Sequence, residues 1–85
     1  MYKIEKITDR KGWVKDDEDS VRHMGCLVVA KMEEGCALLH CRKDNRGRIC
    51  DRYIRTSLIQ HWDKDKDTGD IILETMNSVY HLKQV

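Results

Sequence analysis

Apolar runs alternate with polar stretches along this chain, and four of the polar stretches contain a glycine. Glycine adopts positive φ without steric cost, so a polar sequence that ends in glycine is typical of a tight turn between strands. The turns predicted in this way lie at Gly12, Gly35, Gly47 and Gly69. Because each turn separates two apolar runs, the pattern predicts a succession of β-hairpins.

The apolar runs have the length and the residue types of short strands. Several of them alternate apolar and polar positions, as half-buried strands do. Turns that recur about every ten residues are typical of small antiparallel β-domains. We therefore expect an all-β fold, a small antiparallel SH3-like barrel of five to six strands, in a single domain at residues 1–85. The expected strands are drawn from the runs at 2–8, 24–32, 36–42, 49–54, 58–62, 71–75 and 78–82.

The run at 24–32 permits two interpretations. Its apolar residues, together with Val21, also fit one face of a helix that would have Ser20 as its N-cap. Gly25 and the β-branched pair Val28 and Val29 disfavour a helix interior, however. We favour a strand here, and the alternative is an α+β fold with a helix at about 21–34.

The predicted core takes one or two large apolar residues from each strand. Where apolar residues are consecutive, the alternation of a strand does not decide which of them points inward. Trp62 is also expected to contribute to the core. The other residues expected in the core are Ile4, Ile7, Leu27, Val29, Leu39, Ile54, Ile59, Ile72 and Tyr80.

Composition limits the kinds of protein that the chain can be. Its 85 residues are 40% apolar and 36% charged, which indicates a globular domain with a charged exterior rather than a disordered polyelectrolyte. A chain of this length buries only about 60–65% of its unfolded surface, so self-association is expected to support its stability. No apolar run is long enough to cross a bilayer, and no signal peptide is recognised at the N-terminus. The expected location is the cytoplasm.

Positive charge is concentrated between residues 42 and 55, although the net charge of the chain is only +1. Small β-barrels present basic strands and loops of this kind to nucleic acid. The spacing of the arginines on one strand does not place them all on one face, and the chain has few aromatic residues for base stacking. Nucleic acid is therefore the less favoured partner. The candidate nucleic-acid-binding residues are Arg42, Lys43, Arg46, Arg48, Arg52 and Arg55.

Two groups of residues raise the further alternative of a metal-binding domain. The chain has four cysteines and four histidines, but no two cysteines have the short spacing of a zinc motif. In the segment Asp63–Glu74, carboxylates recur as in a calcium-binding loop, but Thr68 stands where that loop needs glycine. Buried thiols and a charged hairpin loop explain these residues more simply, so we assign no metal ligands.

No residue pattern points to catalysis. The sequence has no glycine-rich phosphate loop, no zinc-protease helix motif and no serine in a nucleophile elbow. The acidic run at 16–19 lies in a polar segment, where solvent would leave the carboxyl groups with ordinary acidity. We therefore expect neither an enzyme nor a cofactor.

The last third of the chain resembles the tail of small uncharacterised bacterial and phage-type β proteins. The residues that carry the resemblance are Arg55-Thr56-Ser57-Leu58-Ile59 and the segment from Gly69 to Leu82, which ends in Thr-Met-Asn-Ser-Val-Tyr-His-Leu. In those proteins a Thr-Ser-x-Ile segment precedes a hairpin that ends in Thr-x-Asn-Ser-x-Tyr-x-Leu. The resemblance implies an all-β domain in a bacterial or mobile-element setting, and it implies no activity and no binding residues.

These observations lead to one favoured function. A small β-domain without catalytic groups, with apolar residues on both faces of its strands, is expected to be a protein-interaction or accessory module. Its partner would be an unidentified protein or a second copy of the chain, joined through a sheet edge or a flat face. Nucleic-acid binding through the segment 42–55 is the alternative, and metal binding is a further one.

Overall fold

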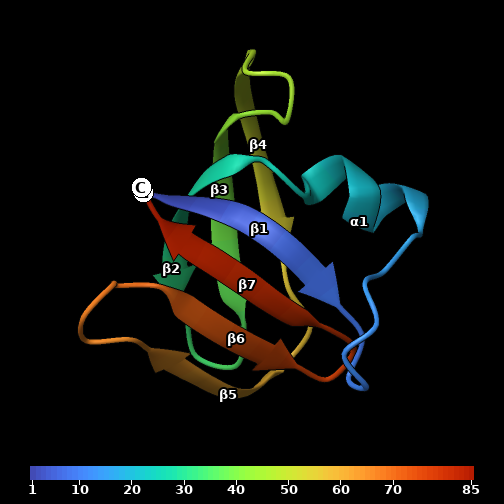
Figure 1. Ribbon diagram of the computed structural model, residues 1–85, viewed down its shortest axis with the longest axis vertical. Coiled ribbons are helices and arrows are strands. Elements are labelled where there is room, and N and C mark those ends of the chain that lie inside the picture. The colour runs from blue at the N-terminus through green and yellow to red at the C-terminus, as the bar shows by residue number, and fades with distance from the viewer.

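In the computed structural model, which describes residues 1–85, β-strands form most of the chain and one short helix follows the first strand (Figure 1). The predicted turns at Gly35, Gly47 and Gly69 are confirmed, because each lies between two consecutive antiparallel strands. The elements are β1 (Tyr2–Thr8), α1 (Glu18–His23), β2 (Leu27–Met32), β3 (Ala37–Lys43), β4 (Ile49–Arg55), β5 (Ile59–Lys64), β6 (Ile71–Thr75) and β7 (Val79–Gln84).

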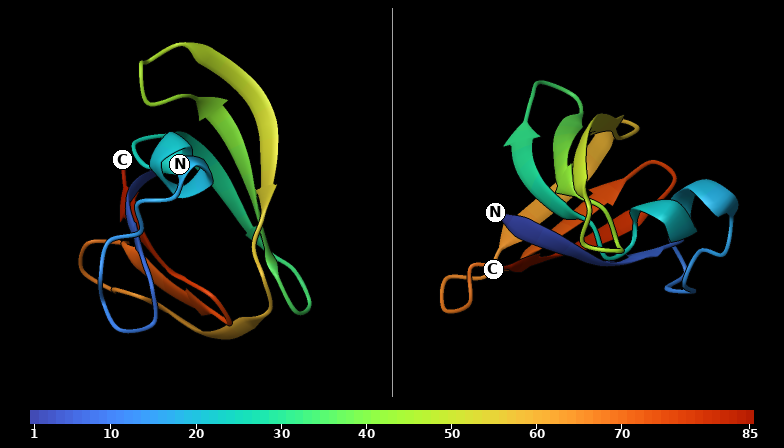
Figure 2. Two further views of the ribbon diagram at one scale, coloured as in Figure 1. Left: turned by 90° about the vertical axis from the view of Figure 1, so that its right-hand side faces the viewer. Right: turned by 90° about the horizontal axis from the view of Figure 1, so that it is seen from above.

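The strands form one antiparallel sheet of seven strands in the order β4-β3-β2-β1-β7-β6-β5. The sheet is bent into a trough with β4 and β5 as its outer strands (Figure 2). The all-β prediction is confirmed, but the prediction of an SH3-like barrel of five to six strands is wrong. Closure would need a ladder between β4 and β5, whereas the amide of Ile59 instead donates to the carbonyl of Gly35 in the β2–β3 turn at 2.8 Å. The bent sheet therefore keeps two free edges.

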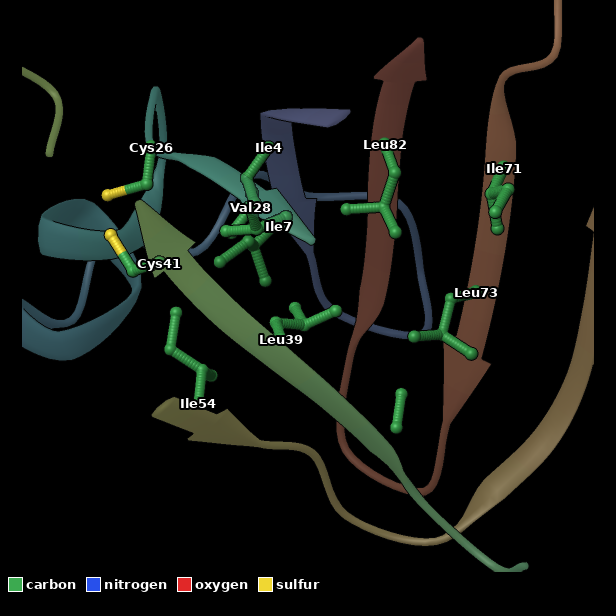
Figure 3. Packing of buried hydrophobic residues seen from close by; sticks show 11 residues of the cluster. Ile4, Ile7, Cys26, Val28, Leu39, Cys41, Ile54, Ile71, Leu73 and Leu82 are labelled. Carbon is green, nitrogen blue, oxygen red and sulfur yellow. The ribbon is translucent and has the colours of Figure 1, made fainter. Parts of the chain in front are cut away.

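The core fills the concave side of this trough. Residues from β2, β3 and β4 meet residues from β1, β6 and β7 across it (Figure 3). Strands β2, β3, β4, β6 and β7 present alternate residues to this side, and a β-bulge in β1 brings both Ile4 and Ile7 to it. A single sheet thus surrounds its own core without a second layer. The buried apolar residues are Ile4, Ile7, Cys26, Val28, Ala37, Leu39, Cys41, Ile54, Ile71, Leu73 and Leu82.

Four members of the predicted core are confirmed as buried, and three more are partly buried. The buried ones are Ile4, Ile7, Leu39 and Ile54, and the partly buried ones are Leu27, Ile59 and Tyr80.

The other members of the predicted core are on the surface. Val29 and Ile72 are 45% and 40% exposed, because their neighbours Val28 and Leu73 take the inward positions. Trp62 is 44% exposed, since it lies on β5 and no further strand covers that edge.

The helix overlaps only the first three residues of the segment for which the alternative interpretation proposed one. Residues 27–32 form β2, and the α+β alternative with a helix at about 21–34 is wrong. Instead, Asp17 caps a six-residue helix by accepting the amide of Ser20 at 3.0 Å. Acidic residues in its first turn and basic residues in its last turn complement the helix dipole. This helix is neither long nor apolar enough to span a membrane.

Candidate functional site

The six basic residues of the segment 42–55 lie in three separate places. Arg46, Arg48 and Arg52 line one groove, so the structure brings half of the predicted set together. Arg42 and Lys43 line a second pocket beside Met1, Leu27 and Ile49. Arg55 lies at the C-terminal end of β4, where its Nη1 atom is 3.6 Å from the sulfur of Cys36.

The groove that holds three of these arginines lies between α1 and the β3–β4 turn and has a volume of about 440 Å³. We call it the arginine groove. The residues that α1 contributes to it were not predicted from the sequence, and they include a fourth arginine, Arg22. The lining residues are Glu18, Val21, Arg22, Asp44, Asn45, Arg46, Arg48 and Arg52.

Asp44 organises the turn on one side of the arginine groove. Its Oδ1 atom accepts the amides of Arg46 at 2.9 Å and of Arg48 at 3.0 Å, and its Oδ2 atom accepts Arg48 Nε at 3.2 Å. The amides of Arg48 and Arg46, in that order of effect, lower the pKa of the Asp44 carboxyl group below its ordinary value. The turn is therefore held by a carboxylate that stays ionised at neutral pH.

Asn45 connects this turn to the helix. Its Nδ2 atom donates to the carbonyls of Val21 at 3.5 Å and Arg22 at 3.4 Å, at the end of α1. Gly25 makes the close approach possible, since a Cβ atom there would lie 3.0 Å from the Cβ atom of Asn45. Its φ of +89° also lies in the region that favours glycine. The two walls of the arginine groove are thus fixed against each other.

Arg52 differs from the other arginines because it lies on the concave side of β4, on the same side as Cys50 and buried Ile54. Its Nε atom is buried and has no hydrogen-bond acceptor. Its Nη2 atom donates only to the sulfur of Cys26, a weak acceptor, at 3.8 Å. Burial lowers the pKa of His23, and the positive charge of Arg52 lowers it further. The Arg52 guanidinium forms no ion pair with a carboxylate.

Three of the four cysteines gather next to this arginine. Cys26 and Cys41 are buried, and their sulfur atoms point into the same space (Figure 3). All four cysteines are free thiols. Burial, together with the neighbouring thiols of Cys50 and Cys26, raises the pKa of Cys41 to about 12. Cys41 therefore remains a neutral thiol at physiological pH.

The buried Cys41 thiol predicts a loss of stability in alkaline solution. In the unfolded chain its pKa is 9.0, and in the fold it is about 12, so folding disfavours the thiolate. The neutral thiol makes its full contribution to the free energy of unfolding below pH 9. This contribution is lost as the pH rises towards 12, at no more than about 1.4 kcal/mol per pH unit. Urea unfolding under reducing conditions at several pH values measures this loss.

The matched variant is Cys41→Ala, which should be less stable at pH 8 but should lose less stability between pH 9 and 12. A residual slope is expected, because burial also raises the pKa of Tyr80 above 10.0. An unchanged slope in the variant would contradict the assignment of the alkaline loss to Cys41.

The acidic segment Asp63–Glu74 forms the end of β5, a loop and most of β6. Asp65 Oδ1 accepts the amides of Asp67 at 2.8 Å and Thr68 at 3.0 Å, and Asp70 Oδ1 accepts the amide of Gln84 at 2.8 Å. These carboxylates therefore close the loop and fix it to β7. No group of three histidine, cysteine or acidic side chains in the structure is arranged to hold a metal ion.

The free edge of β4 is a second candidate site. The amide of Thr56 donates to the carbonyl of Ala37 on β3 at 3.0 Å. Along an antiparallel pair, every second residue directs its backbone N–H and C=O groups towards the neighbouring strand. Ile54 and Arg52 therefore also direct their backbone groups towards β3. Asp51, Tyr53 and Arg55 consequently direct theirs away from the sheet. We call these three residues the β4 edge. Their side chains share the convex face, on which Tyr53 is 61% exposed.

Tyr53 is held in place by its cross-strand neighbour. The rings of His40 and Tyr53 stack with their centres 4.3 Å apart and an angle of 14° between the planes. The Nε2 atom of His40 also forms a hydrogen bond with Oδ1 of Asp51. The aromatic and acidic side chains of the β4 edge are thus ordered before any partner binds.

Comparisons with known proteins add no further assignment to these sites. No protein-family model, no curated protein and no solved structure matches the chain. The resemblance of its tail to small bacterial and phage-type β proteins stays a prediction. The arginine groove and the β4 edge are therefore interpreted from their own geometry.

Proposed function

We propose that this protein is a non-catalytic interaction module that associates through the β4 edge, and that its partner is a second copy of the chain. The observation that carries the proposal is the composition of that edge. Asp51, Tyr53 and Arg55 combine unpaired backbone groups with side chains that complement their own copies. An exposed edge strand is a template for antiparallel addition of another strand.

The complementarity appears when two β4 strands are placed antiparallel about a two-fold axis at Tyr53. Asp51 then lies opposite Arg55 of the second copy, and Arg55 lies opposite Asp51 of the second copy. Tyr53 pairs with its own symmetry mate. Opposite charges and aromatic pairs across strands each contribute roughly 0.2–1 kcal/mol. Every residue of the β4 edge thus gains a favourable partner, as an isologous interface requires.

The neighbouring register is disfavoured by charge. A two-fold axis at Arg52 would place this arginine opposite its own copy on the concave face, where the two guanidinium groups would repel each other. It would also place Asp51 opposite Tyr53 and leave both carboxylates without a cation. Charge therefore selects the register centred on Tyr53.

Charge reversal at Asp51 tests the proposal. Sedimentation equilibrium from micromolar to millimolar concentration should show a reversible dimer of the natural chain. Asp51→Arg replaces two attractive pairs by two repulsive ones, so the dissociation constant should rise about tenfold or more. Arg55→Asp should have the same effect. A mixture of the two variants should form a heterodimer, because each arginine then faces a carboxylate again.

The control is Asp63→Arg on β5, which reverses a charge on the opposite edge of the sheet and should leave the dimer unchanged. A natural chain that stays monomeric at millimolar concentration would refute self-association. Single variants that dimerise like the natural chain would show that the β4 edge is not the interface.

Nucleic-acid binding stays a prediction, and the separation of the basic residues makes it the less favoured function. A polynucleotide track needs cations spread along one surface, whereas Arg42 and Lys43 lie apart from the arginine groove and Arg55 belongs to the β4 edge. The basic residues that do converge surround a compact space.

A further inference from the structure

The arginine groove contains more positive charge than its own carboxylates balance. Its lining has four arginines and two carboxylates. Glu18 lies 3.5 Å from Arg22, and Asp44 lies 3.2 Å from Arg48. Arg46 and Arg52 form no ion pair within the fold. The groove therefore presents two guanidinium groups that are free to meet an anion.

The helix end beside the groove does not cancel this charge. The C-terminus of a helix carries partial negative charge on its last carbonyl groups. The carbonyls of Val21 and Arg22 accept the side-chain amide of Asn45, so they are partly satisfied within the groove wall. The positive side chain of Arg22 also lies on this last turn. An anion in the groove would thus meet the guanidinium groups of several arginines.

Arg52 is the residue that a purely structural role explains least. A buried donor without an acceptor destabilises the fold, because it has lost its hydrogen bonds to water. Arg52 has such a donor in Nε, and the sulfur of Cys26 is a poor partner for Nη2. A hydrophobic residue would suit its position beside Ile54 on the concave face better. An oxyanion in the groove would give Arg52 the negatively charged partner that the fold does not provide.

We propose that the arginine groove binds a compact phosphate-bearing ligand, either inorganic phosphate or pyrophosphate, or the terminal phosphate of a mononucleotide. Arg46 and Arg52 hold the phosphate oxygens, and the pairs at Arg22 and Arg48 form the sides of the site. Two unpaired guanidinium groups match the double charge of a phosphate monoester, and their planar fork suits its oxygens. A volume of about 440 Å³ accommodates a small organic group attached to the phosphate.

Isothermal titration of the full chain at low salt tests this site, with pyrophosphate, AMP and ADP as probes. Bidentate contacts between an arginine and a phosphate are among the strong charge-assisted hydrogen bonds, so Arg52→Gln should weaken binding at least tenfold. Arg46 lies in an exposed turn, so Arg46→Gln provides a second variant that leaves the core intact. It should weaken binding severalfold.

Arg42→Gln is the matched control, because it removes the same charge outside the groove and should leave affinity unchanged. Equal affinity for pyrophosphate and ADP would assign the site to the phosphate alone, and tighter binding of ADP would assign it to a nucleotide. Absence of binding by the natural chain at millimolar probe would overturn the proposal. So would binding of a single-stranded oligonucleotide that Arg42→Gln weakens as much as Arg52→Gln does, since that result indicates a long track.

Discussion

Leu39→Ala is expected to lower the free energy of unfolding by about 3–4 kcal/mol. Leu39 is fully buried in β3, a strand that is paired on both sides. Truncation removes the apolar area and leaves a cavity that the paired strands cannot close. A small domain has a total stability of about 5–15 kcal/mol, so the variant should lose a large fraction of its stability. Urea unfolding followed by circular dichroism measures the effect.

The control is Leu58→Ala, which removes the same atoms from a side chain that is 56% exposed in the β4–β5 connection. Its cost should stay below about 1 kcal/mol, because little buried area is lost. If both variants were destabilised equally, the concave side of the sheet would not be the core. The comparison thus tests the direction in which β3 faces.

Gly25→Ala is expected to destabilise the fold nearly as much, by about 2–4 kcal/mol. Two costs combine at this residue. Its φ of +89° is unfavourable for alanine, and the new Cβ atom would lie 3.0 Å from the Cβ atom of Asn45. The clash can be relieved only if the β3–β4 turn moves away from α1. Thermal unfolding should therefore show a melting temperature lower by at least about 8 °C.

Gly47→Ala separates the two costs. Gly47 also has a positive φ, +78°, but no atom lies within 4 Å of a Cβ atom added there. This variant should lose only about 1 kcal/mol through backbone strain. Two variants of equal stability would show that the contact between Gly25 and Asn45 is not tight. Because that contact fixes the two walls of the arginine groove, Gly25→Ala should also weaken anion binding.

The sequence pattern predicted the strands and turns well, and it predicted the inward faces most directly where an apolar residue has polar neighbours on both sides. Ile4 and Ile7 stand in such positions and are buried as predicted. In the consecutive apolar run that contains Val28 and Val29, both residues suit a core, and the sequence offers no local reason to choose. Register with β1 and β3 makes the choice, and register depends on the whole sheet. Whether the sheet closes into a barrel likewise depends on the register of all its strands.

Three of the four arginines in the arginine groove were recognised in the sequence as part of a cluster of basic residues. Arg22 was missed because it lies in a helix that precedes β2, and only the β3–β4 turn brings the two segments together. The usable signal was the N-cap Asp17 followed by Glu18 and Asp19, which marks the start of a helix. The inward direction of Arg52 had no signal, since a charged residue is normally expected on the convex face.

The pairing of β1 with β7 has a consequence for how the chain folds. The first and last strands lie side by side at the centre of the sheet, with Tyr2 opposite Gln84, whereas the register of β1 with β2 covers only Tyr2 and Lys3 (Figure 1). The two halves of the core therefore join only after the C-terminal strand has been synthesised. Such distant pairing costs loop-closure entropy before any contact offsets it, so folding is expected on the slow, millisecond-to-second scale of β-domains. Until β7 has emerged from the ribosome, one edge of β1 remains unpaired.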